Sequence, residues 1–150
     1  MFVTAKDDGL IPYVLTQILD ACVNGVTLSD PDLPDNPIVY ANRAFEEMSG
    51  YTQAEIVGRN CRFLQGEDRD QEGLQTIRAA LAKKESCVVT LRNYRKNGEM
   101  FLNRLAIRPL VDREGNVIYY LGVQYDITQQ VKAREEIEQL HLRLERLAGT

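Results

Sequence analysis

The chain has 150 residues, of which 44% are hydrophobic and 27% charged, and its formal net charge is -4. This length suits one domain with one sizeable core, and the composition excludes disordered and fibrous proteins. The negative charge argues against general nucleic-acid binding, because duplex binders draw most of their affinity from basic side chains that neutralise phosphates. Any anion that the protein binds must therefore be held by a local group of cations.

The sequence also limits where the protein works. No apolar run approaches the roughly 20 residues that cross a bilayer, and the charged N-terminus lacks the form of a signal peptide. The cysteines, Cys22, Cys61 and Cys87, are odd in number and far apart, and the chain has a single histidine. This pattern argues against disulfides and against a metal site. We expect a cytoplasmic protein with reduced thiols and no membrane partner.

A helix is predicted first. After Pro12, apolar residues recur at helical spacing until Asn24 and Gly25 stop the pattern. We expect an N-terminal extension, residues 1–24, whose amphipathic helix covers either its own domain or a second copy of the chain.

Short strands and short helices are predicted next. Residues 26–28 and 38–40 have the pattern of two strands on either side of a turn-rich loop. Asn42 can cap a short helix, and the spacing of Thr52 and Glu55 is that of a capping box, which predicts a further one-turn helix. The segment that follows is expected to be irregular, in a place where scaffolds often carry functional side chains.

That segment, Gly58 to Gly66, places Cys61 among arginine and amide side chains and beside two apolar residues. A lone cysteine is most often a small buried hydrophobic residue. Here its neighbours favour a thiol that faces a bound aromatic cofactor, because apolar side chains suit a flat ring, amides suit its polar edge and an arginine can hold an anionic tail. The candidate residues of the segment are Asn60, Cys61, Arg62, Leu64 and Gln65.

A longer helix is predicted from Asp70, as its cap, to about Lys84, with a buried stripe that begins at Leu74. Arg78 lies four residues after Leu74, at the margin of this stripe. Its guanidinium group can project over the edge of a cleft, or it can remain a solvated surface charge.

Three more strands are predicted in the second half of the chain. Asn97 and Gly98 are a strong signal for a two-residue type I′ hairpin turn. With the two earlier strands, the pattern predicts an α+β domain over residues 25–127, with a five-stranded antiparallel sheet and short helices on one face. The three late strands comprise residues 88–95, 100–110 and 117–127.

Strand parity places three amides on the inward face of this sheet. Asn93, Asn103 and Gln124 lie in inward rows that are otherwise mainly apolar, and Leu105 shares the row of Asn103. A buried amide is costly unless it finds partners. The three amides can pair with each other, or they can present donors and acceptors to the polar edge of one planar ring. The outward row of the last strand is apolar too, so we expect this strand to be central.

A final helix is predicted over residues 128–150, with a heptad pattern about two heptads long. It can pack on the domain, or it can pair with a second copy. Its apolar positions step by 4, 3, 4 and 3 residues, through Ala133, Ile137, Leu140, Leu144 and Leu147.

These residues resemble a known family. The hexapeptide from Asn60 to Gln65 resembles the signature of light-oxygen-voltage domains, which are blue-light sensors of the PAS fold that bind flavin mononucleotide (FMN). The similarity runs from about Gly25 to Thr128. It implies a photosensory module rather than an enzyme, in which Cys61 forms a reversible bond to flavin carbon C4a after light is absorbed. The other matching stretches are 93–98, 101–103 and 122–124.

The resemblance also implies roles for single residues. The amides of Asn93 and Asn103 would bind the pyrimidine edge of the ring, and Gln124 would be the switch, because flavin N5 changes from a hydrogen-bond acceptor to a donor. The phosphate would be held by Arg62 and Arg78, with Arg69 as a further candidate. The implied cofactor-binding residues are Thr27, Asn60, Arg62, Leu64, Gln65, Arg69, Arg78, Asn93, Asn103, Leu105 and Gln124.

Thr27 departs from the family pattern, in which an aliphatic residue usually lies beside the flavin. We expect its hydroxyl, or a water that it admits, to ease proton loss from N5 and to shorten the light-formed state. Leu102 departs as well, because the family often has an aromatic residue there, but parity turns it away from the pocket.

Two other functions stay open. The chain can be a flavin redox protein that uses Cys61 incidentally, or a PAS dimerisation module without photochemistry. In each case we expect a homodimer through the terminal helices or the outer row at Leu121, Val123 and Tyr125. A downstream effector, in a partner protein or in sequence beyond this chain, is expected to provide the output.

Overall fold

The computed structural model describes residues 10–149 and contains the predicted five-stranded antiparallel sheet. The strand order is β2-β1-β5-β4-β3, so the expectation of a central last strand is confirmed. The central strand makes backbone hydrogen bonds to neighbours on both sides. The strands are β1 (Gly25–Ser29), β2 (Ile38–Ala41), β3 (Cys87–Tyr94), β4 (Met100–Val111) and β5 (Val117–Asp126).

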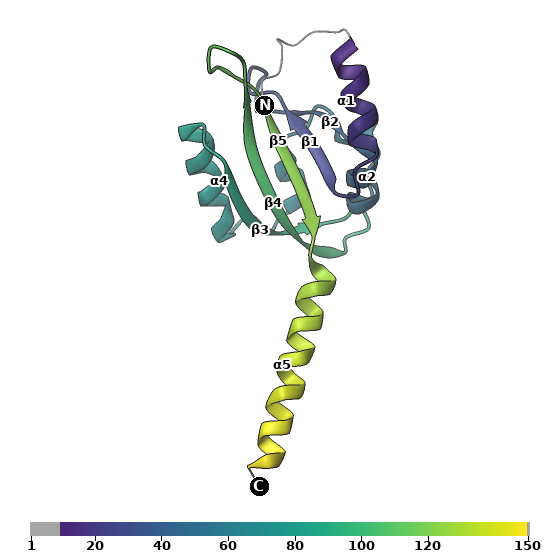
Figure 1. Ribbon diagram of the computed structural model, residues 1–150, viewed down its shortest axis with the longest axis vertical. Coiled ribbons are helices and arrows are strands. Elements are labelled where there is room, and N and C mark those ends of the chain that lie inside the picture. Colours follow the sequence, from purple (N-terminus) through teal and green to yellow (C-terminus); the bar gives the residue numbers. More distant parts are fainter. Residues whose placement is uncertain (1–9, 150) are drawn as a thin grey trace.

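Short helices cover one face of the sheet and lie behind it in Figure 1. Longer helices flank the domain, and the last of them extends away from the sheet (Figure 1). This helix therefore does not pack along the domain, which was one of the two expectations for it. The helices are α1 (Leu10–Asp20), α2 (Arg43–Ser49), α3 (Gln53–Ile56), the 3₁₀ helix η1 (Cys61–Gln65), α4 (Glu72–Lys83) and α5 (Thr128–Ala148).

Asn42 joins three elements of the fold. Its side-chain oxygen accepts hydrogen bonds from the backbone nitrogens of Val26 (2.8 Å) and Phe45 (3.1 Å). Its side-chain nitrogen donates to the carbonyls of Leu19 (2.8 Å) and Asn24 (3.0 Å). The amide thus caps α2 as predicted and also ties the end of α1 to β1. In the leading helix, the side chains of Pro12 and Leu15 lie outside the described part of the structure.

The capping box of α3 is confirmed, but the predicted type I′ turn is wrong. The hairpin between β3 and β4 closes with a hydrogen bond from the Gly98 nitrogen to the Arg95 carbonyl (2.9 Å). Gly98 has a φ of 89°, whereas Asn97 is not in the left-handed region. A type I′ turn needs a positive φ at both central residues. The chain instead uses a longer loop in which only the glycine is left-handed.

The predicted cap of α4 is also wrong. The helix begins at Glu72, and Gln71 rather than Asp70 occupies the capping position, without a capping hydrogen bond. The Gln71 amide pairs with the edge strand instead, since its oxygen accepts from the Arg92 nitrogen (2.7 Å) and its nitrogen donates to the Arg92 carbonyl (2.9 Å). The Gln71 side chain therefore makes the two backbone hydrogen bonds that a neighbouring strand would make to this part of β3.

Asp68 holds the same segment on β3. Its carboxylate accepts hydrogen bonds from Arg92 Nε (2.7 Å), Arg92 Nη2 (2.8 Å) and the Tyr94 hydroxyl (2.6 Å). These bonds lower the pKa of Asp68 to about 2. The turn before α4 is thus fastened to the edge of the sheet, and with it the position at which α4 begins.

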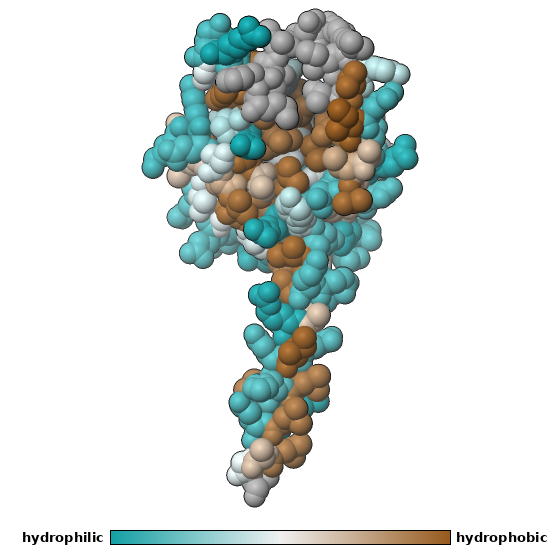
Figure 2. Space-filling model, viewed as in Figure 1, coloured by the Kyte–Doolittle hydropathy of each residue, from teal (hydrophilic) through white to brown (hydrophobic). Residues whose placement is uncertain are grey.

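The outer face of the sheet is apolar along its centre. Tyr119, Leu121 and Val123 of β5 are partly buried, and Tyr125 is 39% exposed. Figure 2 shows hydrophobic side chains gathered over the sheet and α1 and along one side of α5. The surfaces expected to bind a second copy, on the sheet, α1 and α5, therefore all carry apolar side chains on the side of the molecule that Figure 2 shows.

The Asp68 contacts predict a specific loss of stability in acid. A carboxylate whose pKa is lowered by folding stabilises the fold above its ordinary pKa, and this contribution disappears as the pH falls through the lowered value. The free energy of unfolding should therefore fall between pH 3.8 and about 2. Asp68→Asn should be less stable than the parent at neutral pH and should converge with it near the lower value.

Urea denaturation across this pH range measures the difference. Glu67→Gln, at the exposed neighbouring carboxylate, is the matched control and should keep the pH dependence of the parent chain. A pH dependence that is identical in the parent chain and in Asp68→Asn would show that these hydrogen bonds do not stabilise the fold.

Candidate functional site

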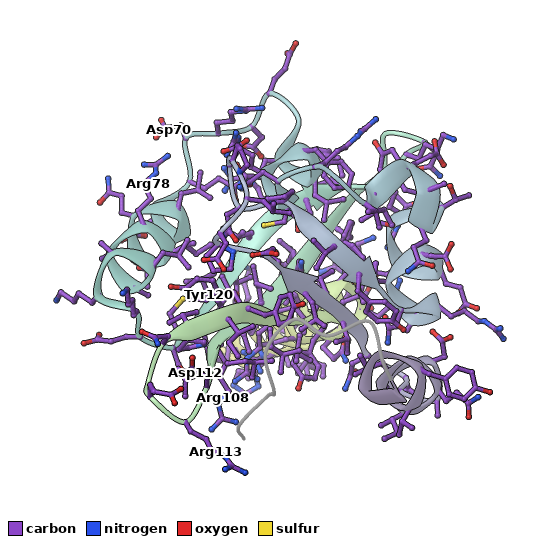
Figure 3. The ribbon with its side chains drawn as sticks, turned by 90° about the horizontal axis from the view of Figure 1, so that it is seen from above. Asp70, Arg78, Arg108, Asp112, Arg113 and Tyr120 are labelled. Atoms are coloured by element: carbon purple, nitrogen blue, oxygen red, sulfur yellow. The ribbon has the colours of Figure 1, made fainter. Side chains whose placement is uncertain are left out.

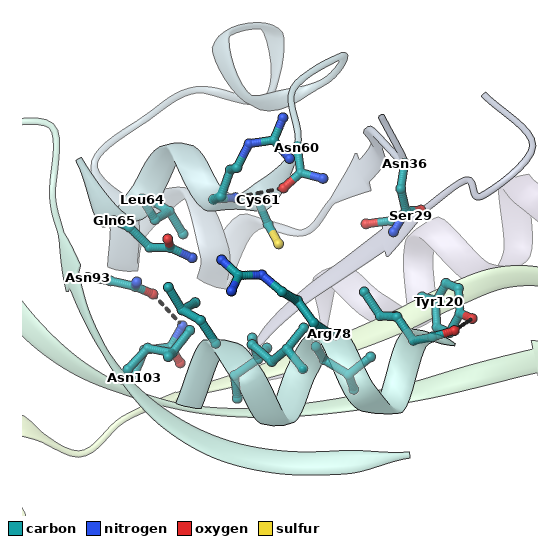
Figure 4. A pocket seen from close by; sticks show the side chains of 18 of the residues that line it. Ser29, Asn36, Asn60, Cys61, Leu64, Gln65, Arg78, Asn93, Asn103 and Tyr120 are labelled. Atoms are coloured by element: carbon teal, nitrogen blue, oxygen red, sulfur yellow. Dashed lines mark hydrogen bonds between the residues drawn. The ribbon is translucent and has the colours of Figure 1, made fainter. Parts of the chain in front are cut away.

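A cavity lies between the inner face of the sheet and the helices η1 and α4 (Figure 4). Of the predicted site residues, all except Thr27 and Gln124 line it. Apolar side chains make most of the wall and favour a flat, poorly hydrated ligand. The apolar lining residues are Leu64, Leu74, Ile77, Leu81, Leu91, Leu105 and Ile107.

Cys61 is presented by regular structure, contrary to the prediction of an irregular segment. Asn60 caps the 3₁₀ helix η1, because its side-chain oxygen accepts from the Arg62 nitrogen (3.0 Å). The Cys61 thiol then points into the cavity (Figure 4). Burial raises the pKa of this thiol, and the positive charge of Arg62 only partly opposes the effect. The sulfur is therefore held as a neutral thiol, which is a poor nucleophile.

Asn93 and Asn103 meet at one end of the cavity. The Asn103 side-chain nitrogen donates to the Asn93 oxygen (2.9 Å), and the Asn93 nitrogen donates to the Arg92 carbonyl (3.0 Å). Asn103 Oδ1 is buried and has no donor among the described residues. The two amides thus pair with each other, which was one expectation, yet the pair still presents an acceptor for a ligand.

Gln124 lies beside the cavity floor, next to Thr27. Its side-chain nitrogen donates to Thr27 Oγ1 (3.2 Å), while its buried Oε1 has no donor in the described part of the chain. Gly122 makes this arrangement possible, since a Cβ there would lie 2.6 Å from Thr27 Oγ1 and 3.0 Å from Gln124 Nε2. The absence of a side chain at Gly122 leaves the floor flat and both polar groups close to it.

Sequence reasoning missed Asn36 as a site residue. It lines the cavity, has a φ of 47°, and its buried Oδ1 has no donor among residues 10–149. Asparagine adopts left-handed backbone more readily than other non-glycine residues, so its place in the turn-rich loop was the available signal. Ser29 and Tyr120 also line the cavity and were not predicted.

The three predicted phosphate-binding arginines all line the cavity, but they differ in the partners that they already have. Arg62 forms an ion pair with Asp35, and Arg69 Nε donates to the Gly66 carbonyl (3.1 Å). Arg78 has no hydrogen-bond or ion-pair partner in the described residues, and its guanidinium group points into the cavity (Figure 4). Figure 3 shows that Arg78 projects from α4 on the opposite side of the sheet from Arg108. Of the three, Arg78 is thus the cation available to an anion.

These features fit a planar heteroaromatic ring with an anionic tail. Apolar walls suit the ring, the unpaired amide oxygens suit a polar edge that carries donors, and the unpaired guanidinium suits a phosphate. In residues 10–149, no cluster of acidic, histidine or cysteine side chains could hold a metal ion. None of the helices in this range is long and apolar enough to cross a membrane.

Residues 23–129 match the PAS domain family. A blue-light photoreceptor of Listeria innocua is 39% identical over 135 residues, which cover 90% of this chain and 53% of that protein. The chain therefore spans about half the length of this relative.

Solved structures give the same assignment. A light-oxygen-voltage domain whose mechanism was probed with a flavin analogue shares 42% identity and a TM-score of 0.74, over 89% of this chain and 99% of that one. An RNA-binding light-oxygen-voltage receptor shares 34% identity and a TM-score of 0.79, over 100% of this chain and 43% of that one. The predicted fold and resemblance are thus confirmed, and the chain belongs to the light-oxygen-voltage domains of the PAS family.

Proposed function

We propose that this protein is a blue-light sensor that binds FMN in the cavity and uses Cys61 as its reactive group. The observation that carries the proposal is the partly buried Cys61 thiol, whose pKa is raised by burial and which points into an apolar cavity that ends in unpaired amide oxygens. When bound, FMN would supply blue-light absorption and two ring atoms, C4a and N5, that can react reversibly with the sulfur and the proton of the Cys61 thiol.

The residues around the cavity divide the work of binding. Asn93 and Asn103 hold the polar ring edge, where Asn103 Oδ1 accepts a ring N–H. Leu64 and Leu105, which line the cavity, would contact the ring faces and limit the access of water to the thiol. Gln65, Asn60 and Asn36 also line the cavity and would offer polar groups to the ribityl chain, although the Asn60 amide already bonds to the Asp35 carbonyl (2.8 Å) and to the Arg62 nitrogen.

Arg78 holds the phosphate, because it is the guanidinium group that faces the cavity without a partner. Arg62 contributes a second charge if the phosphate displaces Asp35 from it, and Arg69 also lines the cavity. This local group of cations explains how a chain of net negative charge can bind an anion.

Gln124 transmits the light-induced change in hydrogen bonding at flavin N5 to α5. Two residues after it, Asp126 accepts hydrogen bonds from Arg95 Nη2 (2.8 Å), the Thr128 nitrogen (3.0 Å) and the Thr128 hydroxyl (2.6 Å). The Thr128 hydroxyl in turn accepts from the Leu102 nitrogen of β4 (2.9 Å). A rotation of the Gln124 amide therefore acts on a strand whose end is bonded to the first turn of α5.

The α5 seam pairs with a second copy of the chain. Four of its apolar residues, Ile137, Leu140, Leu144 and Leu147, are 56–73% exposed, and they recur at heptad spacing. A coiled coil buries such a row. The output then passes to an effector domain or protein attached to this dimer.

Illumination tests the proposed photochemistry. The FMN-loaded protein should lose its blue absorption under blue light and regain it in darkness, whereas Cys61→Ala should keep the flavin and not bleach. Absorption spectroscopy measures both, and Cys87→Ala is the control because that thiol does not line the cavity. Bleaching that persists in Cys61→Ala would indicate a flavin redox protein, and a protein without bound flavin would indicate a dimerisation module.

Phosphate recognition is tested by comparing two flavins. Arg78→Ala should weaken FMN binding about 10-fold to 100-fold, the loss expected for charge-assisted hydrogen bonds, while leaving the affinity for riboflavin nearly unchanged. Fluorescence titration measures both affinities. Arg108→Ala removes the same charge from the outer face and should leave FMN binding intact. Equal losses for FMN and riboflavin would contradict a phosphate contact.

The dimer is tested on one helix. Leu140→Glu places a charge in the α5 seam and should weaken association at least about tenfold. Leu142→Glu places the same charge on the same exposed helix but outside the seam, and should leave the dimer intact. Sedimentation measures both variants. A monomeric parent chain, or an equal effect of both substitutions, would refute pairing through this seam.

A further inference from the structure

We propose that Thr27 is a positioning residue for the Gln124 side-chain amide, and that its hydroxyl pairs with this amide in both orientations that a light response requires. The inference rests on the proposed function for its role in light. The pairing itself rests only on residues of this chain.

The contact is built into the sheet. Thr27 of β1 lies opposite Gly122 of β5, and Gly25 lies opposite Gln124, so the two side chains meet diagonally across one strand pair. They are 4% and 3% exposed, respectively. Their polar atoms are 3.2 Å apart, and the missing side chain of Gly122 is what lets them approach.

A hydroxyl suits an amide that rotates. Thr27 Oγ1 now accepts a hydrogen bond from Gln124 Nε2, and Gln124 Oε1 has no donor among the described residues. If the amide rotates by half a turn, Oε1 comes to face Thr27, and the same hydroxyl can donate to it. An aliphatic side chain offers a partner in neither orientation.

This assigns the effect of Thr27 to the amide rather than to the ring. From the sequence we expected its hydroxyl to act on flavin N5. In the structure Thr27 does not line the cavity, and its hydroxyl accepts a hydrogen bond from Gln124. The same hydroxyl can change from acceptor to donor as the amide turns, so it offers the amide a partner at both ends of the rotation and lowers the barrier to the return. Thr27 therefore shortens the light state by freeing Gln124 to rotate.

The first test needs no flavin. In the flavin-free protein, Thr27→Val keeps the side-chain shape and removes the hydroxyl, so the NMR resonances of the Gln124 side-chain NH₂ should shift. Thr27→Ser keeps the hydroxyl and should leave them near the parent positions. Thr90→Val, on the exposed face of β3, is the matched control and should also leave them unchanged. Resonances that ignore Thr27→Val would overturn the pairing.

The second test uses the light response. Dark recovery should slow about 3-fold to 10-fold in Thr27→Val, the equivalent of one net hydrogen bond, and little in Thr27→Ser. In a Gln124→Leu background, Thr27→Val should have no further effect. Equal slowing with and without Gln124 would mean that Thr27 acts directly on the ring, and would overturn the proposal. A recovery rate that is unchanged in Thr27→Val would overturn it as well.

The two experiments separate this inference from the proposed function. If the chain neither binds flavin nor bleaches, the proposed function fails, and the amide resonances still decide whether Thr27 holds Gln124. If the chain bleaches normally and the resonances do not respond to Thr27→Val, the sensor stands and the inference fails.

Discussion

The site depends on two buried amide oxygens, those of Asn103 and Gln124, which need hydrogen-bond donors. Each lacks a donor among the described residues, and a buried acceptor left in this state costs about 1–3 kcal/mol. Asn103 lies on β4 and Gln124 on the neighbouring strand β5, and both side chains are buried on the inner face of the sheet. A ligand whose edge carries donors removes this cost. Binding and fold stability are therefore coupled in this domain, because the ligand stabilises the folded state that presents these oxygens.

The pairing of the arginine side chains likewise explains which of them can bind an anion. Arg62 and Arg92 are both engaged by aspartates, so that neither guanidinium group is free. Arg78 escapes such pairing because of where α4 lies. Gly73 brings the first turn of α4 directly onto β3, since a Cβ there would lie 3.0 Å from Leu91 Cδ2. The helix then runs along the cavity rather than away from it, and its next turn carries Arg78 over the opening.

Local chemistry made much of the fold predictable. Capping at Asn42, the period of two along the strands and the glycine-containing turns all act within a few residues, and parity alone brought Asn93 and Asn103 to one face. Two of the failures have a common physical cause, which is competition from groups far away in the sequence. Gln71 replaced Asp70 because it could bond to the edge strand, 21 residues away, and Arg62 is held by Asp35, 27 residues away. A pattern of neighbouring residues cannot predict which distant group a side chain will bond to.

The position of β5 decides what the switch can reach. Gln124 stands on the central strand, so its amide contacts β1 at Thr27 while its backbone continues into Asp126 and α5. The neighbouring residue of β1, Val26, is bonded to Asn42, which also holds the end of α1. The Gln124 amide is thus four residues from the first residue of α5, and it contacts β1 next to Val26, which bonds to the Asn42 side chain that also holds the end of α1. Because both helices carry exposed apolar surface, a small change at Gln124 can bias either contact with a second copy, provided that each has two packings of similar free energy.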